Sequence, residues 1–315
     1  MTTVSDISNT LSADAEFVGG PSNFYSSVFL YGMGAVELLS DWGYQPGEDA
    51  MIEIESALDA AETYSEGQAL PSPIESTYLN AKFTFKHFRG VIRESGHERR
   101  ARGPADQGRR VKDPERKMKR AIESIKDKMA KTFDDAATHG LEGQVSAGTY
   151  AFGDQVRTTH TSLKAYELNA STAAVSTALL GKFFHVGADT PYGVNADIGV
   201  TSSTQARRIA ELGAGKLAIP HAAGGLNLVW TDLLIGTAPV VIMPNLTTSI
   251  VLLLSGVRAG KWGMVWNEAN PGRFHVLDLG AANMDNPLNL QISTSCAMAH
   301  TNPNEQGKLY GLSTG

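Results

Sequence analysis

Residues 74–140 read IESTYLNAKFTFKHFRGVIRESGHERRARGPADQGRRVKDPERKMKRAIESIKDKMAKTFDDAATHG, and this stretch decides the fold. Its first part, 78–93, is rich in aromatic and β-branched residues, which predicts an extended strand. A strongly basic break follows at 99–110. The last part, 114–138, has the spacing of an amphipathic helix. The stretch therefore predicts a strand that leads, through a basic break, into a long helix.

Sequence signals mark both ends of the predicted helix. Asp113 can accept hydrogen bonds from the free N–H groups of the first turn, and Pro114 suits the first helical position. Gly140 can end the helix in a left-handed conformation. An apolar stripe recurs at steps of three and four residues: Met118, Ile122, Ile125, Met129, Phe133 and Ala136. A helix of about 25 residues spans about 37 Å, which indicates a strut.

The strand at 78–93 is expected to pair with an earlier one. Residues 51–56 alternate between apolar and polar side chains, and the acidic segment 57–73 between the two predicts an exposed tip. Residues 49–95 thus predict a long two-stranded excursion. On its returning strand, one face carries Phe83, Phe85 and Val91, and the other carries Phe88 and Ile92. Because an isolated two-stranded hairpin is marginal in water, we expect the excursion to lie on another protein surface.

Charge is separated along the chain, although the net charge of −6 says little alone. Residues 1–81 hold 13 Asp and Glu and no Lys, Arg or His, and residues 82–131 hold 17 of the 27 Lys and Arg. Blocks of opposite sign favour contact between an acidic surface and a basic one. Two solvated faces of one monomer would give the same pattern.

Motifs for catalysis, cofactors and metals are missing from the sequence. The single cysteine, Cys296, lies in a strand-like context that predicts a buried structural thiol. The eight histidines show no metal-ligand spacing. The segment 213–216 is similar to a phosphate-binding loop but lacks its first glycine. We therefore predict no catalytic, cofactor or metal site, and a non-enzymatic protein.

Targeting signals are also missing. The chain has no basic start followed by an apolar run, so it predicts no signal peptide and an origin in the cytoplasm. Its most apolar stretch, 238–257, is interrupted by Pro239 and Pro244. That stretch predicts two strands and a turn, and no contact with a membrane.

The basic segment 99–120 has ten Lys and Arg against three acidic residues. This excess suffices for nonspecific contact with nucleic-acid phosphates. No aromatic residue lies within the segment to stack on bases. A cluster that faces solvent or a protein partner explains it equally well.

The second half of the chain predicts a mixture of short strands and one helix. The helix is expected at 204–212, with Ser203 or Thr204 as its cap. The predicted strands are 144–150, 182–186, 240–243, 249–255, 262–266, 273–279 and 288–298.

The order of these elements resembles the major capsid proteins of tailed bacteriophages, which have the HK97-like fold. The likeness rests on residues 82–96 with 117–126, at the return into the helix, and on residues 288–303, 306–307 and 309–311 at the end. It implies an α+β fold with an N-terminal arm, an extended two-stranded loop, a long spine helix, and peripheral and axial domains. Unlike many relatives, this chain has only a short arm before its first apolar stretch, and no Lys and Asn pair can be assigned to a covalent crosslink.

The resemblance also implies domain boundaries. They are 1–48 for the arm, 49–98 for the extended loop and 99–150 for the spine helix of the peripheral domain. Residues 151–270 are expected to form mainly the axial domain, with some strands of the peripheral sheet, and 271–315 the return to the peripheral domain and the tail.

The implied function is structural. The chain would assemble into hexamers and pentamers of a closed icosahedral shell in the host cytoplasm, contact packaged double-stranded DNA nonspecifically, and become part of the virion. Portal, scaffolding and decoration proteins would be its partners. The expected assembly interface comprises Glu62, Glu66, Phe83, Phe85, Val91, Arg109, Arg110, Arg116, Lys117 and Arg120. The alternatives are an encapsulin-like compartment, a DNA-binding accessory protein that uses 99–120, and an enzyme with an unrecognised site.

Overall fold

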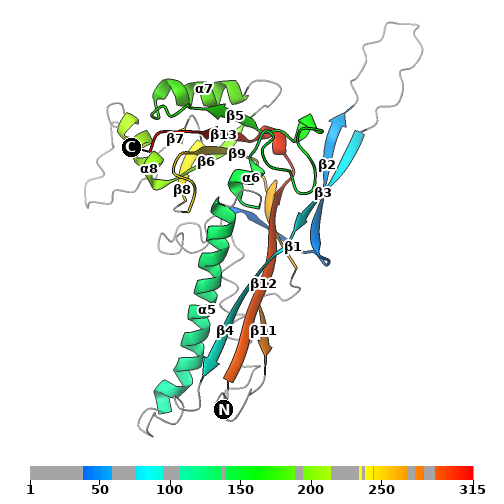
Figure 1. Cartoon of the computed structure of the whole chain (residues 1–315), viewed down its shortest axis with the longest axis vertical. Helices are drawn as coiled ribbons and strands as arrows, with labels where there is room; N and C mark the ends of the chain where they lie inside the picture. The colour runs from blue at the N-terminus through cyan, green and yellow to red at the C-terminus, as the bar shows by residue number, and fades with distance from the viewer. Residues whose placement is uncertain are drawn as a thin grey trace, which may run out of the picture.

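The computed structural model contains two sheets, a long helix and a projecting two-stranded ribbon (Figure 1). It describes residues 38–58, 76–94, 107–135, 139–188, 194–213, 234–235, 238–243, 245–267, 274–279 and 288–314. Residues 1–37 of the predicted N-terminal arm, 59–73 of the acidic tip and 99–106 of the basic break lie outside these residues. The rest of the predicted arm, 38–48, contains a strand of the first sheet, and residues 107–110 of the predicted break are helical. The predicted α+β class is confirmed.

The first sheet is built around β12 (Leu288–His300), a strand of 13 residues. Strand β4 (Lys86–Glu94) pairs with one edge of β12, while β10 (Trp262–Trp266) and β11 (His275–Asp278) follow each other along the other edge. Strand β1 (Ser40–Tyr44) runs parallel to β10. Because side chains alternate along a strand, β12 sends Leu290 and Ile292 into one core, and Ala297 and Ala299 into another.

Helix α5 (Gln107–Asp135) covers one face of this sheet (Figure 1). The apolar stripe is confirmed: Met118, Ile125, Met129 and Phe133 are buried, and Ile122 packs against them. These side chains meet Phe88 and Ile92 of β4 and Leu290 and Ile292 of β12 in one cluster. At 29 residues, α5 is about 43 Å long.

The predicted ends of α5 are wrong. The helix begins at Gln107, so Asp113 and Pro114 lie inside it. An interior proline removes one backbone hydrogen bond, yet the helix continues through Pro114. Gly140 does not end the helix in a left-handed conformation: its φ is −93°, and it precedes the short helix α6 (Leu141–Gln144).

The second sheet has six strands in the order β5-β13-β9-β6-β8-β7. Their bounds are β5 Tyr166–Asn169, β6 Ala196–Thr201, β7 Leu234–Ile235, β8 Ala238–Ile242, β9 Val251–Ser255 and β13 Gly307–Tyr310. Helices α7 (Thr177–Ala188) and α8 (Ser203–Gly213) pack on one face through Phe183, Ala206 and Ile209. Central strand β9 is buried on both faces. Val251 and Leu253 belong to the cluster that includes residues of α7 and α8. Leu252 and Leu254 belong to the cluster that includes the apolar residues of α5.

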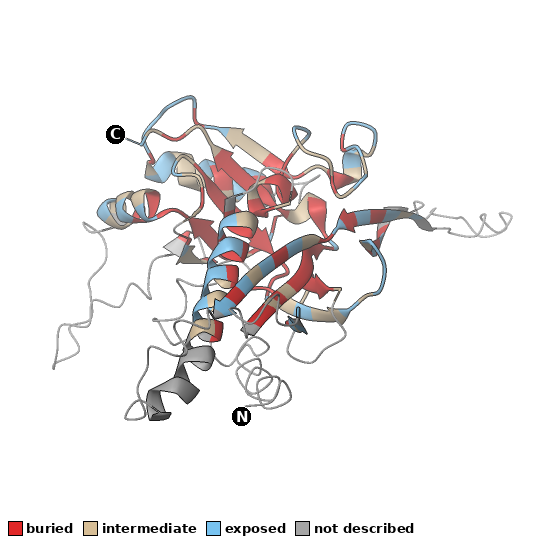
Figure 2. Ribbon diagram, turned by 60° about the horizontal axis from the view of Figure 1, so that its bottom comes forward, coloured by how far each residue is buried: buried red, intermediate tan, exposed pale blue. Residues whose placement is uncertain are grey.

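The predicted excursion forms as an antiparallel ribbon of β2 (Asp49–Leu58) and β3 (Ser76–Thr84). The single strand expected at 78–93 is two strands, β3 and β4, which separate at Phe85. Strand β3 pairs with β2, and β4 leaves the ribbon to pair with β12. In Figure 2, buried and exposed positions alternate along the ribbon's described part and along β4, as expected of strands with one covered face.

Two predicted strands are wrong. Residues 144–150 contain the end of α6 and irregular chain, and residues 182–186 lie within α7. The segment that includes Leu179, Leu180, Phe183 and Phe184 has apolar residues at steps of three and four, which is helical spacing. The Ser176 side chain accepts a hydrogen bond from the Leu179 N–H at 3.2 Å and so caps α7.

The helix at 204–212 and the strands predicted at 240–243, 249–255, 262–266, 273–279 and 288–298 are confirmed to within a few residues. Cys296 is buried on β12, as predicted. In the described part of the chain, no helix combines the length and the apolar composition that crossing a bilayer requires.

Candidate assembly surface

The root of the β2–β3 ribbon is anchored in the chain's own core. Phe83 and Phe85 are 4% and 2% exposed. The ring of Phe83 meets Phe152 edge-on at 5.1 Å between centroids, and both phenylalanines of β3–β4 share a cluster with Leu163 and Val265. The expectation that Phe83 and Phe85 form an assembly interface is therefore corrected, since the subunit itself covers them.

Val91 does not share the face of Phe83 and Phe85. It is 49% exposed, because β4 joins the main sheet and turns its even-numbered residues toward α5. Phe88 and Ile92 fill that side, which leaves Val91 with Arg89 and Arg93 outside the core. Of the three apolar residues expected to share one buried face, only Val91 is available to a partner.

The ribbon offers a second exposed apolar surface that the sequence reasoning missed. Met51 and Tyr78 are 56% and 57% exposed, on the ribbon face opposite the buried Ile52 and Ile54. Strict alternation in 49–58 could have revealed this surface, because Met51 falls on the polar face of the strand. Exposed apolar side chains on a projecting ribbon are a feature of surfaces that bind protein.

The predicted basic residues lie along α5 where they are described. Arg120 is exposed and Lys117 is half-buried. Arg109, Arg110 and Arg116 belong to the first turns of the helix, but their side chains lie outside the described residues. Glu62 and Glu66 also lie outside them. The structure therefore places the basic residues on one helix and leaves their pairing with the acidic tip as a prediction.

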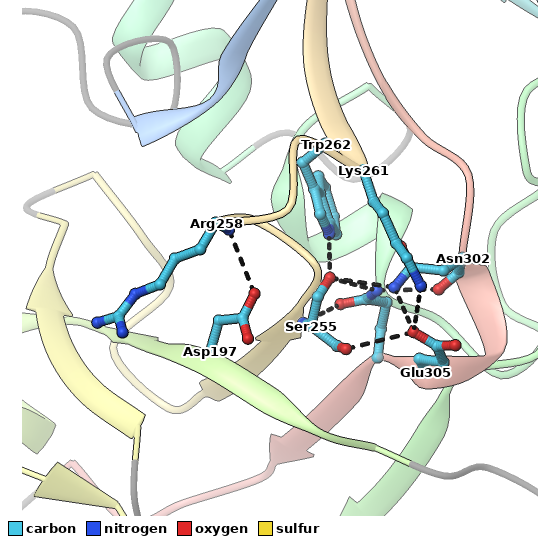
Figure 3. Close-up of polar contacts among 8 residues, drawn as sticks. Asp197, Ser255, Arg258, Lys261, Trp262, Asn302 and Glu305 are labelled. Carbon is cyan, nitrogen blue, oxygen red and sulfur yellow. Dashed lines mark hydrogen bonds and ion pairs between the residues drawn. The ribbon is translucent and has the colours of Figure 1, made fainter. Parts of the chain in front are cut away.

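A partly buried polar cluster joins the two sheets (Figure 3). The carbonyl oxygen of Ser255, at the end of β9, accepts hydrogen bonds from the side chains of Trp262, Asn302 and Gln306 at 3.1 to 3.2 Å. The carboxylate of Glu305 accepts hydrogen bonds from Asn302 at 2.7 Å and from Lys261 at 3.2 Å. Burial would raise the pKa of Glu305, but these hydrogen bonds outweigh it and lower that pKa.

A second buried cluster lies beside the first. The Arg157 guanidinium donates hydrogen bonds to the carbonyls of Gly143, Gln144, Tyr150 and Leu163. Burial lowers the pKa of Arg157 to about 10, so it stays charged at neutral pH. The two clusters tie together loops from four parts of the sequence, which makes the two-sheet body a rigid base for the ribbon.

His300 lies between these clusters and carries a pH dependence. Its ring stacks on Trp262 with 4.0 Å between centroids and meets Phe152 at 4.8 Å. Burial lowers the pKa of His300 well below its ordinary value, and the positive charge of Arg157 acts in the same direction. Below pH 6.5 the unfolded chain therefore binds a proton that the folded chain does not bind, and stability falls as pH falls.

The variant His300→Phe keeps an aromatic ring against Trp262. We expect its free energy of unfolding to fall less steeply below pH 6.5 than that of the unaltered chain. The histidine contributes a slope of up to about 1.4 kcal/mol per pH unit below its unfolded-state pKa. Urea unfolding at several values between pH 7 and 5 measures the slope, with His275→Phe at an exposed histidine as the matched control. Equal slopes for His300→Phe and the unaltered chain would contradict the assignment.

Metal-binding groups and the single thiol can be checked in the described part of the chain. Within them, no group of three or more His, Cys, Asp and Glu is placed to hold a metal ion. Burial raises the pKa of the Cys296 thiol, which keeps it protonated and unreactive. The buried guanidinium of Arg157 holds loops together. Exposed side chains that a partner could contact lie on the ribbon, β4 and α5.

Comparison with known proteins gives a likeness in structure alone. No protein-family model and no curated protein sequence matches the chain. The fold is similar to a chain of the capsid asymmetric unit of cyanophage A-1(L), with 13% identity, a TM-score of 0.62, and coverage of 87% of this chain and 91% of that one.

Two further solved structures extend the likeness. The capsid of a native GTA particle has 12% identity and a TM-score of 0.56, and covers 87% of this chain and 88% of its own. The SrpI encapsulin of Synechococcus elongatus PCC 7942 has 11% identity and a TM-score of 0.55, with coverage of 86% and 85%. At such identities the comparisons establish the fold, and they do so over most of each chain.

Proposed function

We propose that this chain, whose fold is that of phage capsid and encapsulin shell proteins, is the major capsid protein of a tailed bacteriophage, of the HK97-like type. The observation that carries the proposal is the match to the cyanophage capsid chain along nearly its full length. A structural role also fits a surface dominated by a projecting ribbon and a long basic helix. The work of such a protein is done by its interfaces, without a catalytic site.

Each element then has a role in the shell. Helix α5 is the spine helix, the β2–β3 ribbon is the base of the extended loop, and the sheet around β12 forms the peripheral domain. The six-stranded sheet with α7 and α8 is the axial domain, and its strands other than β13 lie within 151–270. The resemblance implies that residues 271–315 return to the peripheral domain. In this proposal, β13 (Gly307–Tyr310) is assigned to the axial domain instead, because it pairs with β5 and β9 of that sheet.

In this proposal, hexamers and pentamers close into an icosahedral shell in the host cytoplasm. The acidic loop of one subunit lies on the basic helix of its neighbour, and the inner surface meets packaged double-stranded DNA without sequence preference. Portal, scaffolding and decoration proteins are the expected partners. The two polar clusters support this role, since a rigid body transmits the position of one interface to the next.

An encapsulin-like compartment is the second candidate, favoured by the likeness to the SrpI shell. The contents of the particle distinguish the two candidates. A capsid protein encloses DNA, and an encapsulin encloses a cargo enzyme.

We expect the purified chain to form hexamers, pentamers or closed shells at micromolar concentration, because the ribbon exposes Met51 and Tyr78. Analytical ultracentrifugation and negative-stain electron microscopy test this directly. A single species near 33.6 kDa, even with a scaffolding protein or crowding agents, would refute the shell role. Small particles that bind DNA with a steep salt dependence would instead favour a DNA-binding accessory protein.

A further inference from the structure

We propose that the groove between β4 and α5 binds the acidic N-terminal segment of this chain, residues 1–20, as an added β-strand. The segment comes from the same subunit or from a neighbour. The inference goes beyond the shell role, since it concerns one surface and its occupant.

The groove is bounded by an open strand edge. All nine residues of β4 pair with β12 on one side, and no strand in the described residues pairs with the other side. A groove of about 670 Å³ is lined by six consecutive residues of β4, 86–91, and by residues of α5. Consecutive residues of a strand point to opposite faces, so we infer that the groove runs along the free edge of β4, where backbone N–H and C=O groups can pair with an incoming strand.

The charge of the groove selects an acidic occupant. Lys86 and Arg89 of β4 and Lys128 of α5 line it, and no Asp or Glu does. Val91 and Ala121 add apolar surface to the groove. Duplex DNA would meet the cations but would leave the backbone edge and this apolar surface unused. An extended acidic peptide uses all three features.

Residues 1–20 fit these requirements better than the other acidic segment does. They contain Asp6, Asp14 and Glu16, no Lys, Arg or His, and no proline. Apolar residues such as Val4 and Ile7 can contact the apolar residues that line the groove. Segment 59–75 contains Pro71 and Pro73, which cannot donate to a ladder, and both its ends are held in the ribbon by β2 and β3.

The N-terminal segment is long enough to reach the groove. Residues 1–37 precede the first described residue, Leu38, and 37 extended residues span up to roughly 120 Å. A strand matched to the nine residues of β4 needs only about 30 Å.

Site-specific photocrosslinking in the full chain identifies the occupant without assuming it. The photoreactive residue p-benzoylphenylalanine replaces Ser124, an exposed and uncharged residue of the groove wall, and mass spectrometry maps the crosslinked peptides after irradiation. We expect peptides from residues 1–20. The matched control carries the same photoreactive residue at Glu123, which is exposed on α5 but does not line the groove, and should give none of them.

Two sets of variants test the binding mode. Arg89→Glu with Lys128→Glu should reduce the crosslink at least fivefold, while Lys131→Glu, at an exposed lysine outside the groove, should leave it within twofold. Proline at two adjacent residues of the crosslinked stretch should abolish the crosslink, and alanine at both should preserve it. Crosslinks to 59–75, to DNA or to another protein, no crosslink at all, or insensitivity to proline would each overturn the proposal.

Discussion

Phe85→Asp should abolish folding of the subunit. The side chain is 2% exposed and belongs to the cluster that anchors the ribbon to the main sheet. Loss of a buried phenylalanine ring alone costs about 3–5 kcal/mol, and a carboxylate without a partner in the same place adds a further penalty. Because native proteins are stable by only about 5–15 kcal/mol, we expect the variant to accumulate as insoluble protein. The soluble fraction and the urea midpoint measure the effect.

Val91→Asp is the matched control for this prediction. It makes a similar change on the following strand, but at a residue that is 49% exposed. We expect it to fold with a midpoint close to that of the unaltered chain. If Phe85→Asp yields a folded subunit with an unchanged midpoint that fails only in assembly, the phenylalanine belongs to an interface after all.

The contrast between Phe85 and Val91 shows what local sequence can predict here. The alternation of 78–93 correctly predicts extended chain, but it assumes one partner for the whole run. Strand β3 pairs with β2, and β4 pairs with β12, about 200 residues away in sequence. A change of partner at Phe85 changes which face is covered, and no local pattern encodes that change.

The same distinction applies to the helices. The stripe from Met118 to Phe133 is predictable because helical spacing is a local property. The start of α5 is not, since Pro114 is an ordinary first-turn signal that the helix overrides. In α7, adjacent pairs such as Phe183 and Phe184 fit both strand and helix, and packing against β13 and β5 selects the helix.

The candidate surface is predictable to a smaller extent. The separation of charge is visible in composition, and it points to α5. The open edge of β4 is not visible, because it depends on how the two sheets form. Arg157 and His300 are equally hidden, since isolated basic residues in a sequence give no sign that four carbonyls and two aromatic rings will enclose them.

Arg109→Glu with Arg110→Glu should impair shell formation. Both residues lie in the first turns of α5, where seven Lys and Arg occur between Gln107 and Arg120. The positive end of the helix dipole adds to their charge, so the region favours an acidic partner. If the acidic tip of a neighbour supplies it, two pairs at about 1 kcal/mol each amount to about a 30-fold change in affinity at every contact.

The second half of the experiment is a compensating reversal. Glu62→Lys with Glu66→Lys, combined with the arginine reversals, should restore a substantial part of the particle yield. Particle yield and DNA content are measured for each reversal and for the combination, at low and moderate salt. Rescue should weaken as salt rises, because exposed charges more than about 10 Å apart are largely screened at 0.1 M.

A DNA-facing helix makes a different prediction from the same variants. In that case, the arginine reversals leave the shell intact and reduce only its DNA content, and the acidic-side reversals restore nothing. Contacts between subunits repeat at every position of a closed shell, so small pair energies act together on yield, whereas contacts with DNA act only on filling. Full yields of empty shells would therefore place the start of α5 on the inner surface and exclude the intersubunit charge contact.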